Sequence, residues 1–104
     1  MDNNVYYFDY LGIEFKVNSK TYTLLKSIIS EHLEATKSEE TKNLVTSIDL
    51  PVQDLNLIKW RISISTMHRL TTITLFKDNT IFNSITYTLY SLEKLLDESF
   101  KQKM

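Results

Sequence analysis

Two histidines are the residues of this sequence most suited to acid–base chemistry or metal binding. His32 follows Glu31, but Thr36 stands one helical turn later, where a second metal ligand would be needed. His32 also falls at the edge of an apolar stripe with helical spacing, and His68 precedes Arg69 in an expected turn. We therefore interpret His32 as a histidine at the boundary of the core and His68 as a solvated turn residue, neither of them binding a metal ion.

Other kinds of catalytic site lack their defining residues. Gly12 is the only glycine, which excludes glycine-rich nucleophile turns, phosphate-binding loops and dinucleotide fingerprints. The chain has no cysteine, so disulfides and thiolate metal sites are excluded as well. The carboxylate pairs Glu39-Glu40 and Asp97-Glu98 are expected in solvated positions, whereas an acid–base pair needs burial to separate the two pKa values. The sequence thus predicts a protein that is not an enzyme and has no cofactor.

Hydrophobic periodicity predicts the elements that must position these side chains. Alternating apolar and polar residues indicate strands, and apolar residues three or four positions apart indicate amphipathic helices. Asn18-Ser19 and Asn83-Ser84 offer side-chain oxygens that can cap helices at their amino ends. We expect strands over 5–10, 13–17, 44–50, 57–66 and 70–76, a short extension at 80–82, and helices over 20–36 and 85–101.

The order of these main elements is ββαβββα. Most of the strands have one apolar and one polar face, which is typical of an antiparallel sheet covered on one side only. Both helices must bury their apolar stripes, and the apolar face of the sheet is the available surface. At 104 residues, the length fits one domain. The sequence therefore predicts a single α+β domain over 1–104, a two-layer sandwich of one mostly antiparallel sheet with two helices on one face.

A short sequence occurs twice in the chain. Residues 18–24 read NSKTYTL and residues 83–89 read NSITYTL, so the two copies differ at one position only. One explanation is a duplicated strand–helix unit, and the other is convergence on good capping residues in a chain rich in serine and threonine. Both explanations expect a helix to begin at each copy.

The open face of the predicted sheet is the most suggestive surface for binding. Its outward positions carry mainly short hydroxyl side chains and comprise Lys59, Arg61, Ser63, Ser65, Thr72, Thr74 and Phe76, with Val45, Ser47 and Asp49. Short hydroxyl side chains lose little entropy when a partner docks, although they serve equally well as solvated strand formers. Tyr7 is expected to project outward from the first strand as a further binding candidate, and Trp60 is expected in the core.

The formal net charge is only -1, but the charges are unevenly distributed. An acidic stretch in and after the first predicted helix consists of Glu31, Glu34, Glu39 and Glu40. A small basic group consists of Lys59, Arg61 and Arg69. The acidic stretch would suit a basic or nucleic-acid-binding protein partner, and the basic group would make a modest, salt-dependent contact with phosphates.

By elimination, these observations predict a small protein-binding module that occludes a partner protein. Inhibitors, immunity proteins and antagonists from phages or mobile elements fit this description. Lys, Ile and Asn are abundant and have AT-rich codons, and many phages and mobile elements have AT-rich genomes. The alternatives are a nucleic-acid-binding domain that uses the basic strand face, and a self-associating structural or adaptor subunit, such as a homodimer joined at an unpaired sheet edge. We expect a cytoplasmic protein with no membrane partner, because the sequence contains neither a spanning segment nor a secretory or lipidation signal.

Overall fold

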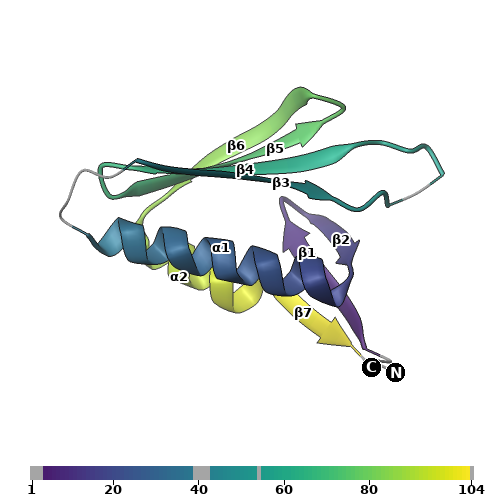
Figure 1. Cartoon of the computed structure of the whole chain (residues 1–104), viewed down its shortest axis with the longest axis horizontal. Coiled ribbons are helices and arrows are strands. Elements are labelled where there is room, and N and C mark those ends of the chain that lie inside the picture. The colour runs from purple at the N-terminus through teal and green to yellow at the C-terminus, as the bar shows by residue number, and fades with distance from the viewer. Residues whose placement is uncertain (1–3, 39–42, 54, 104) are drawn as a thin grey trace.

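The computed structural model describes residues 4–38, 43–53 and 55–103 of the chain (Figure 1). The elements in chain order are β1 (Val5–Tyr10), β2 (Ile13–Val17), α1 (Ser19–Lys37), β3 (Leu44–Leu50), β4 (Trp60–Met67), β5 (Leu70–Lys77), β6 (Thr80–Tyr87), α2 (Leu89–Glu98) and β7 (Phe100–Lys103). The α+β class and the predicted order ββαβββα are confirmed, and β6 and β7 are added to that order.

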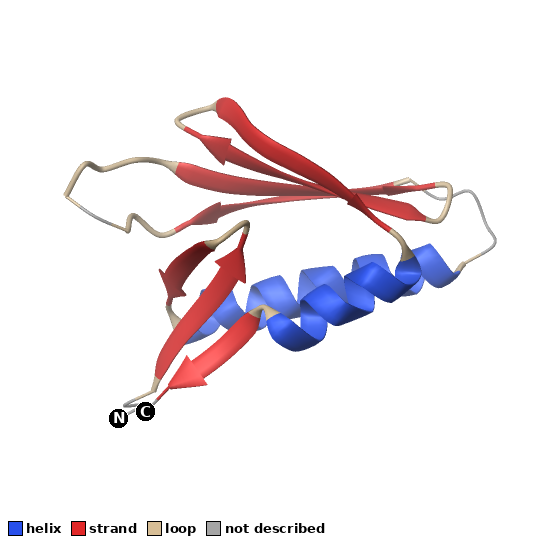
Figure 2. Cartoon of the chain, turned by 180° about the vertical axis from the view of Figure 1, so that it is seen from behind, coloured by secondary structure: helices blue, strands red, loops and turns tan. Residues whose placement is uncertain are grey.

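The strands form two antiparallel sheets, where the sequence predicted one. Strands β3, β4, β5 and β6 follow one another in a four-stranded sheet, whereas β1 pairs with β2 on one side and with β7 on the other. Both helices lie on the same face of the four-stranded sheet, as predicted, and the three-stranded sheet stands at one end of them (Figures 1 and 2). No described element covers the opposite face, which we call the outer face.

One hydrophobic core joins the two sheets and the two helices. Its largest fully buried apolar side chains are Phe8, Phe15, Leu25, Ile29, Ile62, Ile64, Ile73, Leu75 and Leu92. Trp60 is buried at the end of the core next to the β1–β2 hairpin, with its ring centroid 5.3 Å from that of Phe15. The Tyr10 hydroxyl donates to the Ile73 carbonyl at 3.1 Å, and its burial raises the pKa of Tyr10. The small sheet is therefore fixed to the large one through packing and a buried hydrogen bond.

The predicted start of the second helix was wrong. Asn83 and Ser84 do not cap a helix but lie within β6, and the helix begins at Leu89 with Thr88 as its N-cap. Thr88 and Ser91 form a reciprocal capping box, which satisfies two backbone donors instead of one. Residues 80–87 form a strand because their pairing with β5 extends a sheet whose inner face is already buried.

The predicted end of that helix was also wrong. The helix stops at Glu98, and the residues from Phe100 onward form β7 beside β1. Phe100 lies opposite Phe8 in this pairing, with a distance of 5.0 Å between their ring centroids. Aromatic packing against the hairpin thus determines the course of the last residues, and this contact cannot be inferred from helical periodicity.

The repeated sequence adopts two different structures. In the first copy Asn18 caps α1, and its side chain accepts a hydrogen bond of 2.7 Å from the backbone nitrogen of Thr21. In the second copy the residues from Asn83 to Tyr87 are a strand, and only Thr88 and the residues after it belong to the start of α2. The two copies are not structurally equivalent, so the fold gives no support to a duplicated strand–helix unit.

The turn between β4 and β5 carries backbone strain. His68 and Arg69 have φ angles of 52° and 66°, in the left-handed region that favours glycine and asparagine. The turn between β5 and β6 has the same geometry, but there Asp78 and Asn79 tolerate it better. Both His68 and Arg69 are exposed, so no burial offsets the strain.

Replacing Arg69 by glycine is expected to raise the free energy of unfolding by about 1 kcal/mol, because glycine adopts this φ angle without a steric cost. Thermal unfolding should then occur at a midpoint higher by roughly 4 °C or more. Arg69→Ala is the control, since alanine keeps the Cβ atom that causes the strain. Equal unfolding midpoints for the glycine and alanine variants would show that the backbone at position 69 is not strained.

Candidate functional site

The outer face of the four-stranded sheet is a regular array of side chains, most of them short. Cross-strand register aligns them in three rows, Val45–Ser65–Thr72–Thr86, Ser47–Ser63–Thr74–Ser84 and Asp49–Arg61–Phe76–Ile81. All ten residues that the sequence placed on this face are exposed or half-buried, while their strand neighbours such as Ile62 and Ile73 are buried. The predicted orientation is therefore confirmed for the nine of these residues that lie in β3, β4 and β5, whereas Lys59 precedes β4. Whether the face binds a partner remains a prediction.

Hydroxyl groups on this face hold one another in place. Thr72 pairs with Thr86 and Thr74 pairs with Ser84, each with an oxygen–oxygen distance of 2.9 Å. These side chains have few rotatable bonds, so ordering them at an interface costs little conformational entropy. The centre of the outer face can thus act as a rigid contact surface.

One end of the outer face combines an aromatic ring with charges. The Arg61 guanidinium lies 5.0 Å from the centroid of the Phe76 ring, within the range of a cation–π contact. Asp49 stands directly opposite Arg61 in the pairing of β3 with β4. Arginine and aromatic residues often dominate binding energy at interfaces, so this end is the part of the face best suited to an anchor contact.

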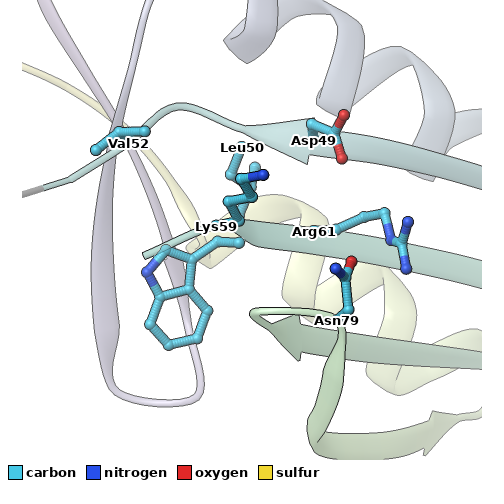
Figure 3. A pocket seen from close by; sticks show the side chains of 7 residues that line it. Asp49, Leu50, Val52, Lys59, Arg61 and Asn79 are labelled. Atoms are coloured by element: carbon cyan, nitrogen blue, oxygen red, sulfur yellow. The ribbon is translucent and has the colours of Figure 1, made fainter. Parts of the chain in front are cut away.

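A pocket of about 370 Å³ adjoins this charged end (Figure 3). It is lined by Asp49, Leu50, Val52, Lys59, Trp60, Arg61 and Asn79. Its cationic side chains are Lys59 and Arg61, and the Lys77 ammonium lies 5.8 Å from the Trp60 ring centroid. The pocket has the size and charge to receive a single acidic or polar side chain.

The predicted basic group is split by the fold. Arg61 lies at the pocket end of β4, and Lys59 precedes the strand, which begins at Trp60 and not at residue 57 as predicted. Arg69 lies in the turn beyond the other end of β4. A strand of this length separates Arg61 from Arg69 by about 20 Å. The three cations therefore do not form one phosphate-binding patch.

The predicted acidic stretch belongs to a different side of the molecule. Glu31 and Glu34 are exposed on α1, which packs against the inner face of the sheet, and Glu34 forms an ion pair of 3.2 Å with Lys37. Glu39 and Glu40 lie outside the described residues. The structure does not bring Glu31 and Glu34 together with the residues of the outer face.

Tyr7 projects from the small sheet, as predicted. It is half-buried, whereas its neighbour Phe8 is fully buried, and the Lys103 ammonium lies 4.8 Å from the Tyr7 ring centroid. Beside it, Lys101 and Asp9 form an ion pair of 2.6 Å that raises the pKa of Lys101. Tyr7 thus stands among charged side chains on a surface separate from the outer face.

His32 is not at the boundary of the core but completely buried within it. Its ring nitrogens pair with threonine hydroxyls, Nδ1 with Thr66 at 2.7 Å and Nε2 with Thr46 at 3.0 Å. Burial lowers the pKa of His32, which favours the neutral ring, and no substrate can reach a side chain with zero exposure. His68 is exposed in its turn, as predicted.

The proton positions in this buried network follow from the carbonyl group at which the chain of hydrogen bonds ends. The Thr36 hydroxyl must donate to the His32 carbonyl at 2.7 Å, since a carbonyl can only accept. Each hydroxyl has one proton, so Thr71 donates to Thr36 and Thr66 donates to Thr71. The Nδ1 atom of His32 must then donate to Thr66, and Nε2 accepts from Thr46. Sequence reasoning missed this network because its threonines lie on separate elements.

The described residues contain no group of three or more histidine and carboxylate side chains that could hold a metal ion. Within the same part of the chain, neither helix is long and apolar enough to cross a membrane. Comparison with known proteins identifies no relative, because no family model, curated protein or solved structure matches the chain. The assignment of a function therefore depends on the geometry of the surface.

Proposed function

We propose that the protein is a small, non-enzymatic binding module that acts by occluding a partner protein, as an inhibitor, an immunity protein or a phage or mobile-element antagonist would. The observation that supports this proposal most strongly is the bare outer face of the four-stranded sheet (Figure 1). Its hydroxyl rows are ordered by their own hydrogen bonds, and Arg61 and Phe76 provide an anchor at one end.

The charges on this face favour a protein over a nucleic acid as the partner. Of the predicted basic group, only Lys59 and Arg61 remain close together, and the carboxylate of Asp49 shares the same pocket. A nucleic-acid surface needs several phosphate contacts, each made by a cation or a hydrogen-bond donor. Arginine and aromatic side chains, such as Arg61 and Phe76 on this face, are instead enriched at protein interfaces.

The area of the outer face limits the mode of binding. Four strands at the usual spacing and length present a surface of about 19 by 25 Å, close to 500 Å² in projection by order of magnitude. A stable protein interface usually buries about 800 Å² on each partner. The outer face therefore forms the centre of the proposed interface, and neighbouring surface must contribute the rest.

Ser63→Lys is expected to abolish binding of the partner protein. Ser63 lies at the centre of the outer face, where a lysine would hold a docking surface away without disturbing the buried side of β4. The measurement is affinity capture from the native host followed by mass spectrometry. Ser27→Lys is the matched control, because it makes the same change at an exposed position on α1. The proposal fails if no protein is captured, or if both variants capture the same proteins as the unmodified chain.

A further inference from the structure

Strand β6 forms one edge of the four-stranded sheet (Figure 1). It pairs with β5 on one side, and no described strand pairs with its other side. The backbone groups on such a free side are a template for a further strand. The pairing with β5 shifts register between Leu75 and Phe76, so residues 83–87 are the regular part of the strand. We call residues 83–87 the β6 edge.

The β6 edge lacks the charges that normally keep edge strands apart. Residues 79–92 contain no Asp, Glu, Lys, Arg or His, although 24% of the chain is charged. The other edge strands carry charges of their own, which are Asp49 in β3, Glu14 and Lys16 in β2, and Lys101 and Lys103 in β7. Such charges protect an edge against pairing with another chain. Among the described strands, only β6 has an edge without this protection.

Two observations indicate which backbone groups of the β6 edge face the free side. The backbone nitrogen of Ser84 donates to the side-chain oxygen of Asn83 at 2.7 Å, so a side chain satisfies this donor within the chain. The hydroxyls of Ser84 and Thr86 each lie 2.9 Å from a threonine hydroxyl of β5. Side chains come this close in antiparallel pairs that exchange no backbone hydrogen bonds. The backbone groups of Ser84 and Thr86 therefore point away from β5.

The β6 edge is complementary to itself. A two-fold axis at Ile85 sets Ser84 opposite Thr86 of a second copy, and these two residues can exchange both of their backbone hydrogen bonds. The same register sets Ile85 opposite its own copy on the inner face, where Ile85 is only half-buried within one chain. On the outer face hydroxyl meets hydroxyl, so the hydroxyl rows continue from one copy to the other. This register uses all of residues 83–87.

The missing charges select a second copy of this chain over a different protein. In a two-fold pair, the residues beside the axis meet residues of the same strand, so a charge there would lie close to its own copy and repel it. A strand from another protein can instead be matched by opposite charges, which gives specificity. The uncharged β6 edge fits the first case. Because β3 at the opposite edge carries Asp49, we expect the pairing to stop at two copies.

We infer that the protein forms a two-fold symmetric homodimer in which the β6 edges of two copies pair antiparallel about Ile85. The two four-stranded sheets then become one continuous sheet, and the two outer faces become one surface. The contact is one short strand wide and smaller than a standard interface, so a weak dimer is expected, with a dissociation constant on the order of 10 µM. This inference does not rest on the proposed function, because it concerns the edge of the sheet and not the outer face.

Sedimentation velocity of the purified chain, at concentrations from about 1 to about 200 µM, tests this inference. The expected result is a monomer at the lowest concentration, mainly a dimer at the highest, and no larger species. Ser84→Lys is expected to raise the dimer dissociation constant at least about tenfold, because the two added charges lie diagonally across the axis. Ser47→Lys is the matched control, since it makes the same change in the same outer-face row at the opposite edge. An equimolar mixture of Ser84→Lys and Ser84→Glu should restore the dimer.

A single introduced cysteine tests the register, because the chain has none of its own. In the inferred pair the two Cα atoms of Ile85 are about 4.5 Å apart, within the range that a disulfide spans. Ile85→Cys is expected to form a disulfide-linked dimer when treated with oxidised glutathione. Ser47→Cys should remain a monomer under the same conditions, since β3 lies at the far edge of the sheet.

A monomer at every concentration would overturn the inference, and so would assemblies that keep growing with concentration. Equal effects of Ser84→Lys and Ser47→Lys would place the contact elsewhere, and a dimer without an Ile85→Cys disulfide would reject the register. Ser63→Lys separates this inference from the proposed function, because it should dimerise as the unmodified chain does. A dimer lost in Ser63→Lys would assign the contact to the outer face and overturn the inference. A dimer that captures no other protein supports the inference and rejects the proposed function.

Discussion

The free energy of unfolding is expected to fall as the pH drops below about 6.5, because His32 resists protonation in the folded protein. Burial lowers the pKa of His32, whereas the unfolded chain restores the ordinary value. Between the lowered pKa and about 6.5, the unfolded state binds more protons than the folded state. Stability is therefore fully present above this window and is lost by up to about 1.4 kcal/mol per pH unit within it.

Urea unfolding at pH values from about 5 to 8 measures this dependence. His32→Gln is expected to remove the part of the slope that lies below about 6.5. His68→Gln is the control, because it makes the same substitution at an exposed position. Proton NMR gives an independent check, since the ring signals of His32 should titrate below the ordinary range. A slope that persists in His32→Gln would contradict the argument.

Thr66→Val is expected to lower the free energy of unfolding by about 2 kcal/mol. Thr66 accepts from the His32 ring and donates to Thr71, so its hydroxyl joins β4 to both α1 and β5. Valine has nearly the same shape but leaves a ring nitrogen and a hydroxyl oxygen without their buried partner. The cost arises from these unsatisfied groups rather than from a cavity.

The matched control for this substitution is Thr72→Val, which removes a hydroxyl that pairs with Thr86 on the exposed outer face. Water can replace the lost partner there, so the change should stay within about 0.5 kcal/mol. Thermal and urea unfolding of the two variants measure the difference. Equal effects would mean that the buried network contributes no more than a surface hydroxyl pair.

Alternation along the strands was the most reliable guide to the fold. In β4 and β5 the residues alternate between large aliphatic and short polar side chains, and this pattern predicted the outer face correctly. The pattern is informative because a strand has a period of two, so one buried face determines the other. The same reasoning places Phe76 outward, where Arg61 stacks on it.

Local sequence predicted the second helix but not the residue at which it begins, because two structures compete for the same residues. The sequence NSITYTL caps a helix when its neighbours permit, as NSKTYTL does at 18–24. At 83–87 the edge of β5 is available, and Ile85 can lie opposite Ile73. Tertiary pairing therefore overrides the capping preference, and the residues themselves do not reveal which will prevail.

The candidate site was only partly predictable for a related reason. The outward positions of Arg61 and Phe76 follow from strand alternation. Lys59 precedes β4, and Arg69 was grouped with these residues only because it is close to them in the sequence. The fold separates Arg69 by a strand length and instead brings the loop between β3 and β4 next to Lys59. The side-chain bonds of Gln53 and Asp78 that fix this loop reach residues 37 and 19 positions away, so no local pattern reports them.

Isothermal titration of the captured partner with the purified chain is the most direct test of the central claim that the outer face binds a protein. We predict that Ser63→Lys raises the dissociation constant by at least about tenfold, equivalent to about 1.4 kcal/mol, while Ser27→Lys leaves it unchanged. Equal dissociation constants for the two variants and the unmodified chain would contradict the claim.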